Sequence, residues 1–134
     1  MDVDEAAVAE VLADAGVRVA YLFGSRASNR HRATSDADIA VLGAARLDLL
    51  ERERLADRLR NILAVPDVDL VILEEAPLEL RGRVVQEGRT IYAADPAERV
   101  NFEVRSRSEY FDFLPVLREH TSRYLRQVAR QGLA

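Results

Sequence analysis

Residues 22–42, LFGSRASNRHRATSDADIAVL, decide the fold of this chain. The apolar run over residues 17–23 ends at Gly24, which predicts a short buried strand followed by a sharp turn. Residues 24–35 are polar and rich in arginine, which predicts a short helix and a loop. Residues 36–42 are apolar again apart from two aspartates and are closed by Gly43, so they predict a second strand.

The two aspartates of the second predicted strand, Asp36 and Asp38, are its most unusual feature. Residues two apart in a strand point to the same face and lie about 7 Å apart along the backbone. Aspartate is depleted in strands, and like charges on one face repel each other. A divalent cation between the carboxylates would offset this cost, because such ions bridge carboxylate and phosphate oxygens. The alternative is a solvent-facing strand edge, with Ala40 and Leu42 continuing that face.

A third predicted strand, residues 68–73, has the sequence VDLVIL. Val68, Leu70 and Ile72 alternate onto one face, so Asp69 lies on the other face of an otherwise apolar strand. If this strand pairs with the second, its carboxylate can converge with those of Asp36 and Asp38. Asp67 is the better candidate for a simple turn residue at the start of the strand.

Gly24 and Ser25 stand where the first predicted strand turns into polar sequence. Glycine lets the backbone approach a ligand closely, and serine can cap a helix while its hydroxyl contacts a phosphate. Backbone N–H groups at the start of a helix would also face an anion. A Gly-Ser pair alone is more often a plain turn, so its meaning depends on its spacing from the aspartates.

The rest of the chain predicts helices that alternate with strands. Gly16 is a plausible end for the first helix, and Pro115 predicts a break in the last one. At the start of that last helix, Asp95 is a good N-cap, and Glu98 is placed to reach back to it. The predicted helices span residues 3–15, 47–64, 77–86 and 95–130, and a fourth strand spans residues 89–93.

These elements predict an α/β (α+β) fold in which a mixed sheet of about four strands is flanked by helices. We expect a single domain overall, with a core over residues 1–94. A C-terminal helical segment, residues 95–134, would pack on this core or on a partner.

The composition excludes several classes of protein. The chain has 134 residues, no cysteine and a net charge of −4, and all of its 19 basic residues are arginine. Thiolate chemistry, a Walker lysine and a Schiff-base lysine are therefore unavailable. The acidic charge argues against binding long nucleic acid, and no apolar run approaches the length of a membrane span. With an acidic N-terminus in place of a signal peptide, we expect a cytoplasmic protein.

Gly24-Ser25, ten residues and Asp36-Ala37-Asp38 form the GS-x10-D-x-D pattern, which resembles the DNA-polymerase-β-like nucleotidyltransferase superfamily. Within it, the chain is similar to the minimal nucleotidyltransferase (MNT) proteins, antitoxins encoded beside HEPN-domain toxins. The likeness extends over VDLVIL, over the segment QEGRTIY and over the helical tail with Tyr110-Phe111-Asp112.

The resemblance implies roles for individual residues. Gly24 and Ser25 would hold the β- and γ-phosphates of ATP, and Asp36 and Asp38 would bind two Mg²⁺ ions. Asp69 would bind the metal nearer the attacking group and act as the base. Arg26 could neutralise charge on the triphosphate, or it could be a solvated surface residue.

One departure from the pattern is local. Many relatives have glycine near position 29, where this chain has Asn29, which tolerates left-handed backbone. We interpret His31 and His120 as surface residues. The stripe of Tyr110, Phe111 and nearby apolar residues could be core or a partner-binding face.

The resemblance further implies an enzyme of the nucleotidyltransferase class with a two-metal mechanism. AMP from ATP would be placed on a tyrosine of a HEPN ribonuclease toxin, which would be silenced within a hetero-oligomer. Two alternatives are transfer to a small molecule such as an aminoglycoside, and an antitoxin that acts by binding alone. Neither long nucleic acid nor a membrane is expected as a partner.

Overall fold

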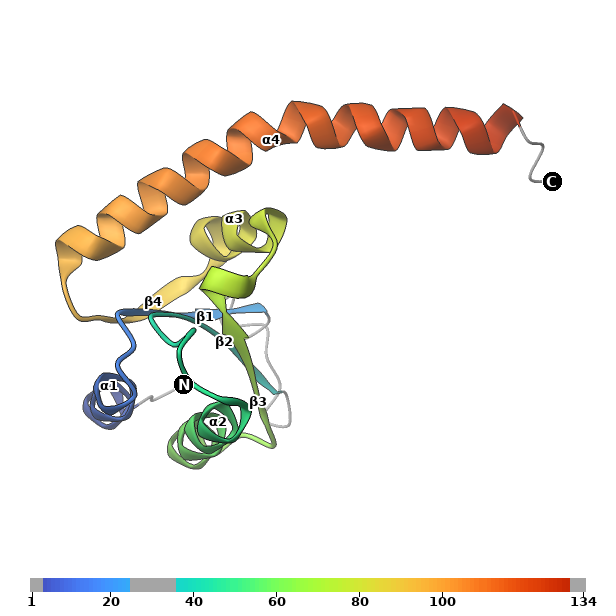
Figure 1. Ribbon diagram of the computed structural model, residues 1–134. Coiled ribbons are helices and arrows are strands. Elements are labelled where there is room, and N and C mark those ends of the chain that lie inside the picture. The colour runs from blue at the N-terminus through green and yellow to red at the C-terminus, as the bar shows by residue number, and fades with distance from the viewer. Residues whose placement is uncertain (1–3, 25–35, 131–134) are drawn as a thin grey trace.

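A four-stranded mixed sheet forms the centre of the protein (Figure 1). The computed structural model describes residues 4–24 and 36–130, without the side chains of residues 116–130. The order of the strands is β3-β2-β1-β4; β2 pairs parallel with β3, and β1 pairs antiparallel with both β2 and β4. The predicted mixed sheet is confirmed, with strands β1 (Val19–Phe23), β2 (Ala37–Leu42), β3 (Val68–Ile72) and β4 (Arg89–Ala93).

Helices cover both faces of this sheet. Figure 1 shows α1 and α2 together on one side, and α3 with the beginning of α4 on the other. The helices predicted over residues 3–15, 47–64, 77–86 and 95–130 are therefore confirmed, although their ends differ by a few residues from those expected. The short helix predicted within residues 24–35 falls outside the described residues, apart from Gly24. Their bounds are α1 (Glu5–Asp14), α2 (Leu49–Leu63), α3 (Leu78–Glu87) and α4 (Pro96–Arg130), and a short 3₁₀ helix, η2 (Leu73–Glu75), follows β3.

The alternation along each strand divides the core into two clusters. Ile39 and Val41 of β2 point toward α1 and α2, where they join the larger apolar cluster. Ala40 belongs to the smaller cluster on the opposite face, beneath α3 and α4, together with Tyr21 and Val84. All of these side chains are buried. Residues 38, 40 and 42 therefore face the α3 side, which fixes the face on which Asp38 lies.

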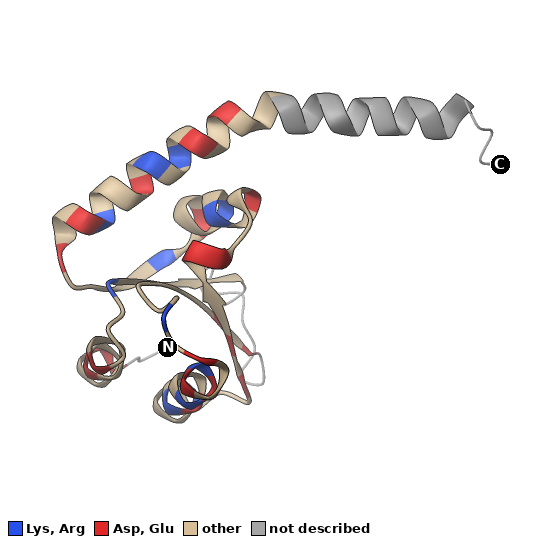
Figure 2. Cartoon of the chain, viewed as in Figure 1, with Lys and Arg blue, Asp and Glu red and all other residues tan. Residues whose placement is uncertain are grey.

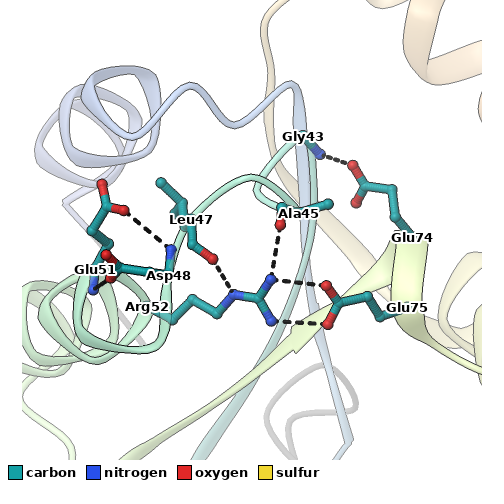
Figure 3. Close-up of polar contacts among 8 residues, drawn as sticks. All are labelled: Gly43, Ala45, Leu47, Asp48, Glu51, Arg52, Glu74 and Glu75. Carbon is teal, nitrogen blue, oxygen red and sulfur yellow. Dashed lines mark hydrogen bonds and ion pairs between the residues drawn. The ribbon is translucent and has the colours of Figure 1, made fainter.

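Arg52 ties the connection after β2 to the connection after β3 (Figure 3). Its guanidinium donates two hydrogen bonds of 2.8 Å to the carboxylate of Glu75 in η2. It also donates to the backbone carbonyls of Ala45 and Leu47 at 2.9 Å. These four bonds, together with that from the Gly43 amide to the Glu74 carboxylate, hold the ends of the parallel strands side by side.

The start of α4 partly differs from the sequence prediction. Asp95 does act as a cap, because its carboxylate accepts a hydrogen bond from the backbone amide of Ala97. The prediction that Glu98 reaches back to this cap is wrong: its carboxylate binds the guanidinium of Arg18. That hydrogen bond lowers the pKa of Glu98. The cation of Arg18, just before β1, thus competes successfully for Glu98 with the backbone amide at the start of the helix.

Acidic and basic residues are mixed along the described part of α4 (Figure 2). Glu103 accepts a hydrogen bond of 3.0 Å from the hydroxyl of the buried Tyr21, and it also pairs with Arg99 one turn earlier. Phe102 and Ser106 are buried on the side facing the sheet. The first half of α4 is therefore attached to the sheet by both polar and apolar contacts.

The predicted break at Pro115 is wrong. The helix is continuous from Pro96 to Arg130, and Figure 1 shows it bending part-way along its length. Proline removes one backbone hydrogen bond, which would have gone to the carbonyl of Phe111. Both residues are exposed, so water can satisfy that carbonyl, and the helix bends without ending.

The packing of α3 against α4 gives a first prediction. A Cβ on Gly82 would collide with the ring of Tyr110, so Gly82→Ala is expected to lower the free energy of unfolding by about 1–3 kcal/mol. Without this contact, replacing glycine by alanine inside an α-helix would stabilise the helix. Urea unfolding measures the change, and adding Tyr110→Ala should remove the penalty. A Gly82→Ala variant more stable than the wild type would contradict the packing described.

Candidate active site

Asp38 and Asp69 are direct neighbours across the parallel pair. In the register of β2 and β3, Asp38 lies opposite Asp69, as Ala40 lies opposite Val71. Val71 and Ala40 both belong to the α3-side cluster, so the alternation places the two carboxylates on that same face. The second and third strands therefore pair, which was the condition for the carboxylates of Asp38 and Asp69 to converge. The two aspartates come from separate segments of the chain, and the sheet brings them together.

The interior position of β2 excludes the alternative that Asp38 lies on a solvent-facing strand edge. A strand edge exposed to solvent would leave Ala40 accessible, whereas Ala40 is fully buried between β1 and β3. Asp67 has the simple role expected of it, since its carboxylate accepts a hydrogen bond from the backbone amide of Val68. Asp38 therefore lies in an interior strand and is not explained as a turn or edge residue.

Gly24 follows β1 directly and packs against the carboxylate of Asp38. Its φ is +73°, a left-handed conformation that glycine adopts at little cost. A Cβ at this position would collide with Oδ2 of Asp38. Phe23, the preceding residue, lies opposite Asp38 in the antiparallel register. The end of β1 and the beginning of β2 thus meet at the carboxylate, and only a glycine backbone leaves it enough room.

A pocket of about 330 Å³ opens at this point. Gly24, Asp38 and Asp69 line one part of it. The helix α3 supplies another part, and apolar side chains complete the lining; the further members are Phe23, Val71, Leu80, Arg83 and Glu87. The volume lies within the range of small-molecule sites. The pocket combines acidic groups with an apolar surface at the end of the sheet.

The environment of Asp38 favours binding of a cation. Partial burial raises the pKa of Asp38, and the negative charges of Asp69 and Asp36 raise it further. Asp36 is exposed and precedes β2 by one residue. The described side chains include no group of three or more Asp, Glu or His residues that could hold a metal ion as they stand. A shared metal site of Asp36, Asp38 and Asp69 therefore stays a prediction.

Other predicted site residues lie outside the described part of the chain. This holds for Ser25, Arg26, Asn29 and His31, and the side chain of His120 is not described either. Sequence reasoning missed Arg83 and Glu87, which line the pocket from α3. Their spacing from Leu80 places all three near one face of a helix. That signal was available, but the sequence did not show that this face borders the aspartates.

A polymerase β nucleotidyltransferase family model matches residues 7–97. This range contains β1, β2 and β3, and thus Gly24, Asp38 and Asp69. The chain belongs to the polymerase β nucleotidyltransferase family. The predicted family and the nucleotidyltransferase class of enzyme are therefore confirmed.

Similar proteins include members of toxin–antitoxin systems. The protein adenylyltransferase MntA of Shewanella oneidensis is 37% identical over 94 residues, which cover 70% of this chain and 66% of that protein. The chain thus matches slightly less than two thirds of the length of MntA. Part of a toxin–antitoxin crystal structure with AMP-PNP is 31% identical, with a TM-score of 0.77, and the match covers 91% of this chain and 98% of that one. Another, a complex of a tri-AMPylated Shewanella oneidensis HEPN toxin with its MNT antitoxin, gives 30% identity and a TM-score of 0.70, covering 90% and 95%.

These matches confirm the predicted likeness to minimal nucleotidyltransferase antitoxins and the predicted fold. No helix in the described residues is both long and apolar enough to span a membrane.

The close approach of Gly24 to Asp38 gives a second prediction. Gly24→Ala is expected to lower the free energy of unfolding by about 1–2 kcal/mol from the left-handed backbone alone, and to displace the Asp38 carboxylate. Urea unfolding reports the first effect, and a crystal structure of the variant reports the second. An unmoved Asp38 carboxylate in that structure would contradict the packing.

The raised pKa of Asp38 gives a third prediction, on stability. The carboxyl of Asp38 ionises at a higher pH in the folded state than in the unfolded state, so the unfolded state binds fewer protons between the two pKa values. Stability is therefore lost as the pH rises through the usual range for aspartate. Asp38→Asn is expected to be more stable than the wild type at pH 7 without divalent cations, and equal to it below about pH 3.5.

Thermal unfolding in a chelating buffer across this pH range measures the difference. The exposed Asp112 on α4 provides a matched control, since Asp112→Asn changes the net charge equally. An Asp38→Asn variant less stable than the wild type at pH 7 would show that the ionised carboxylate does not destabilise the folded state.

Proposed function

We propose that this chain transfers AMP from ATP to a tyrosine of a HEPN ribonuclease toxin and thereby silences the toxin. The observation that carries the proposal is the parallel register that places Asp38 opposite Asp69 beside the left-handed Gly24. All three residues line one pocket large enough for a small-molecule ligand. Membership of the nucleotidyltransferase family supports the type of reaction.

The residues present fit a pair of magnesium ions. Carboxylate oxygens are the preferred ligands of this ion, and both burial and the negative charges of its neighbours raise the pKa of the Asp38 carboxyl. Asp36 and Asp38 would hold both ions, and Asp69 would hold the one nearer the acceptor. When bound, the metal ions supply charge stabilisation for the attacking oxygen and for the leaving pyrophosphate.

The chain's own residues have distinct tasks in the proposed reaction. The oxygen of the acceptor hydroxyl forms a bond to the α-phosphorus of ATP, and the bond from that phosphorus to the bridging oxygen breaks, releasing pyrophosphate. Asp69 takes the proton of the hydroxyl. Gly24 lets the backbone approach the phosphates, and Ser25 and Arg26 would contact them from the segment that follows.

The similar proteins support the choice of nucleotide and acceptor. One matching structure contains AMP-PNP, an analogue of ATP, and another contains an AMPylated HEPN toxin. The relative MntA is a protein adenylyltransferase. We extend these properties to this chain, with ATP as the substrate, a HEPN toxin as the protein partner and the cytoplasm as the place of action.

The C-terminal segment, residues 95–134, would contribute to a complex with the toxin. Its helix α4 buries Phe102 and Ser106 against the core, while Val100, Val104 and Phe111 are each about half exposed. These three positions fall within less than half a turn of one another around a helix. We therefore assign residues 1–94 to the catalytic core and the outer face of α4 to contact with the partner.

Co-expression with the product of the neighbouring reading frame, which we expect to be a HEPN protein, tests the function. Intact-mass measurement is expected to show adenylate additions on the partner with the wild-type chain and none with Asp38→Asn. The matched control is Asp57→Asn, because Asp57 is exposed on α2, on the opposite side of the sheet. This control should leave the additions unchanged.

The outcomes separate the proposed function from its competitors. A partner that stays unmodified yet is still inhibited by the Asp38→Asn chain would mean that the antitoxin acts by binding alone. Adenylate found on a small molecule such as an aminoglycoside, with the protein partner unmodified, would identify the second class of acceptor. Either result would overturn the proposal.

A further inference from the structure

Arg83 is a pocket residue without an assigned role. It lies on α3 and lines the same pocket as Gly24, Asp38 and Asp69. Its side chain is exposed, so packing of the core does not explain its position. The other side chains that α3 contributes to this pocket are those of Leu80 and Glu87. Arg83 is therefore the basic residue among those described around the pocket.

The geometry of α3 would allow Arg83 to form ion pairs within the helix. Glu79 and Glu87 stand four residues before and after it, a spacing at which salt bridges commonly form. Neither pair forms, and no carboxylate of the described residues lies within 4.0 Å of its guanidinium. Arg81, on the same helix, does pair with Glu109 of α4. Within the described structure, the charge of Arg83 thus faces the pocket unpaired.

With divalent cations held by Asp38 and Asp69, the charges around the pocket would suit a ligand that carries several negative groups. Asp38 and Asp69 stand on the sheet side, and Arg83 stands on the helix side together with the exposed Glu87. Of the components of the proposed reaction, adenosine and a tyrosine hydroxyl carry no charge, whereas the polyphosphate carries several. A guanidinium matches two oxygens of one phosphate with parallel hydrogen bonds.

We propose that Arg83 binds the polyphosphate of the nucleotide from the α3 wall of the pocket. The proposal rests on the proposed function, because it takes a nucleoside triphosphate to be the ligand. Arg83 then contacts the phosphates from α3, while Gly24 approaches them from the end of β1. The polyphosphate is thus bound by the backbone at Gly24 and by the side chain of Arg83, which are far apart in the sequence.

Calorimetric titration with ATP and Mg²⁺ tests this role on the full chain. Arg83→Gln is expected to weaken ATP binding about tenfold to a hundredfold, the effect of losing hydrogen bonds to a charged group. Arg83→Lys keeps the charge and should recover part of the affinity. Arg54→Gln is the matched control, since Arg54 is exposed on α2 across the sheet and its loss changes the net charge equally.

The results distinguish failure of this inference from failure of the proposed function. If the wild type does not bind ATP, the proposed function fails. If the wild type and Arg83→Gln bind ATP equally well, the role of Arg83 fails while the proposed function stands. Equal ATP binding with slower AMP transfer would likewise overturn the proposal, and would place Arg83 on the acceptor side. Since Arg83 is exposed, thermal unfolding of the variant should match that of the wild type.

Discussion

The parallel pairing of β2 with β3 is the constraint on which the site depends. A shift of one residue would turn Asp69 to the opposite face, away from Asp38. The register is stabilised on the α1–α2 side by buried apolar residues of both strands, including Ile39 and Ile72. Beyond the strands, Arg52 and its partner Glu75 join the two outgoing connections. The arrangement of Asp38 beside Asp69 is thus maintained by interactions that lie outside the pocket.

The positions of the acidic residues could be predicted because the strands have a simple alternating pattern. In VDLVIL, the apolar residues Val68, Leu70 and Ile72 define the face covered by α1 and α2, so Asp69 had to lie on the other face. The ten-residue spacing between the Gly-Ser pair and Asp36 then linked the turn to the aspartates. Both signals depend only on residues close together in the sequence. Because each face of the sheet packs against its own apolar cluster, the alternation along a strand decides which face each side chain occupies.

The parts that could not be predicted depend on packing between distant elements. Nothing in the sequence of α3 shows that Arg83 borders the aspartates, because that depends on how the helix crosses the sheet. The same reason accounts for Glu98, whose better partner, Arg18, is eighty residues away in the sequence. Pro115 differs: a proline in an exposed part of a helix costs one hydrogen bond that water replaces, so the helix need not end there.

Because β3 lies at the edge of the sheet, Asp69 also affects whether the protein self-associates. Among the described strands, β3 has a neighbour on one side only, and an apolar residue in place of Asp69 would make residues 68–73 a run of six consecutive apolar residues. Such a run on an open edge is a template for strand addition and aggregation, and a charge within the strand opposes this. The carboxylate that we propose as the base of the reaction therefore also opposes self-association through this edge. Selection for solubility and selection for catalysis would preserve the same residue.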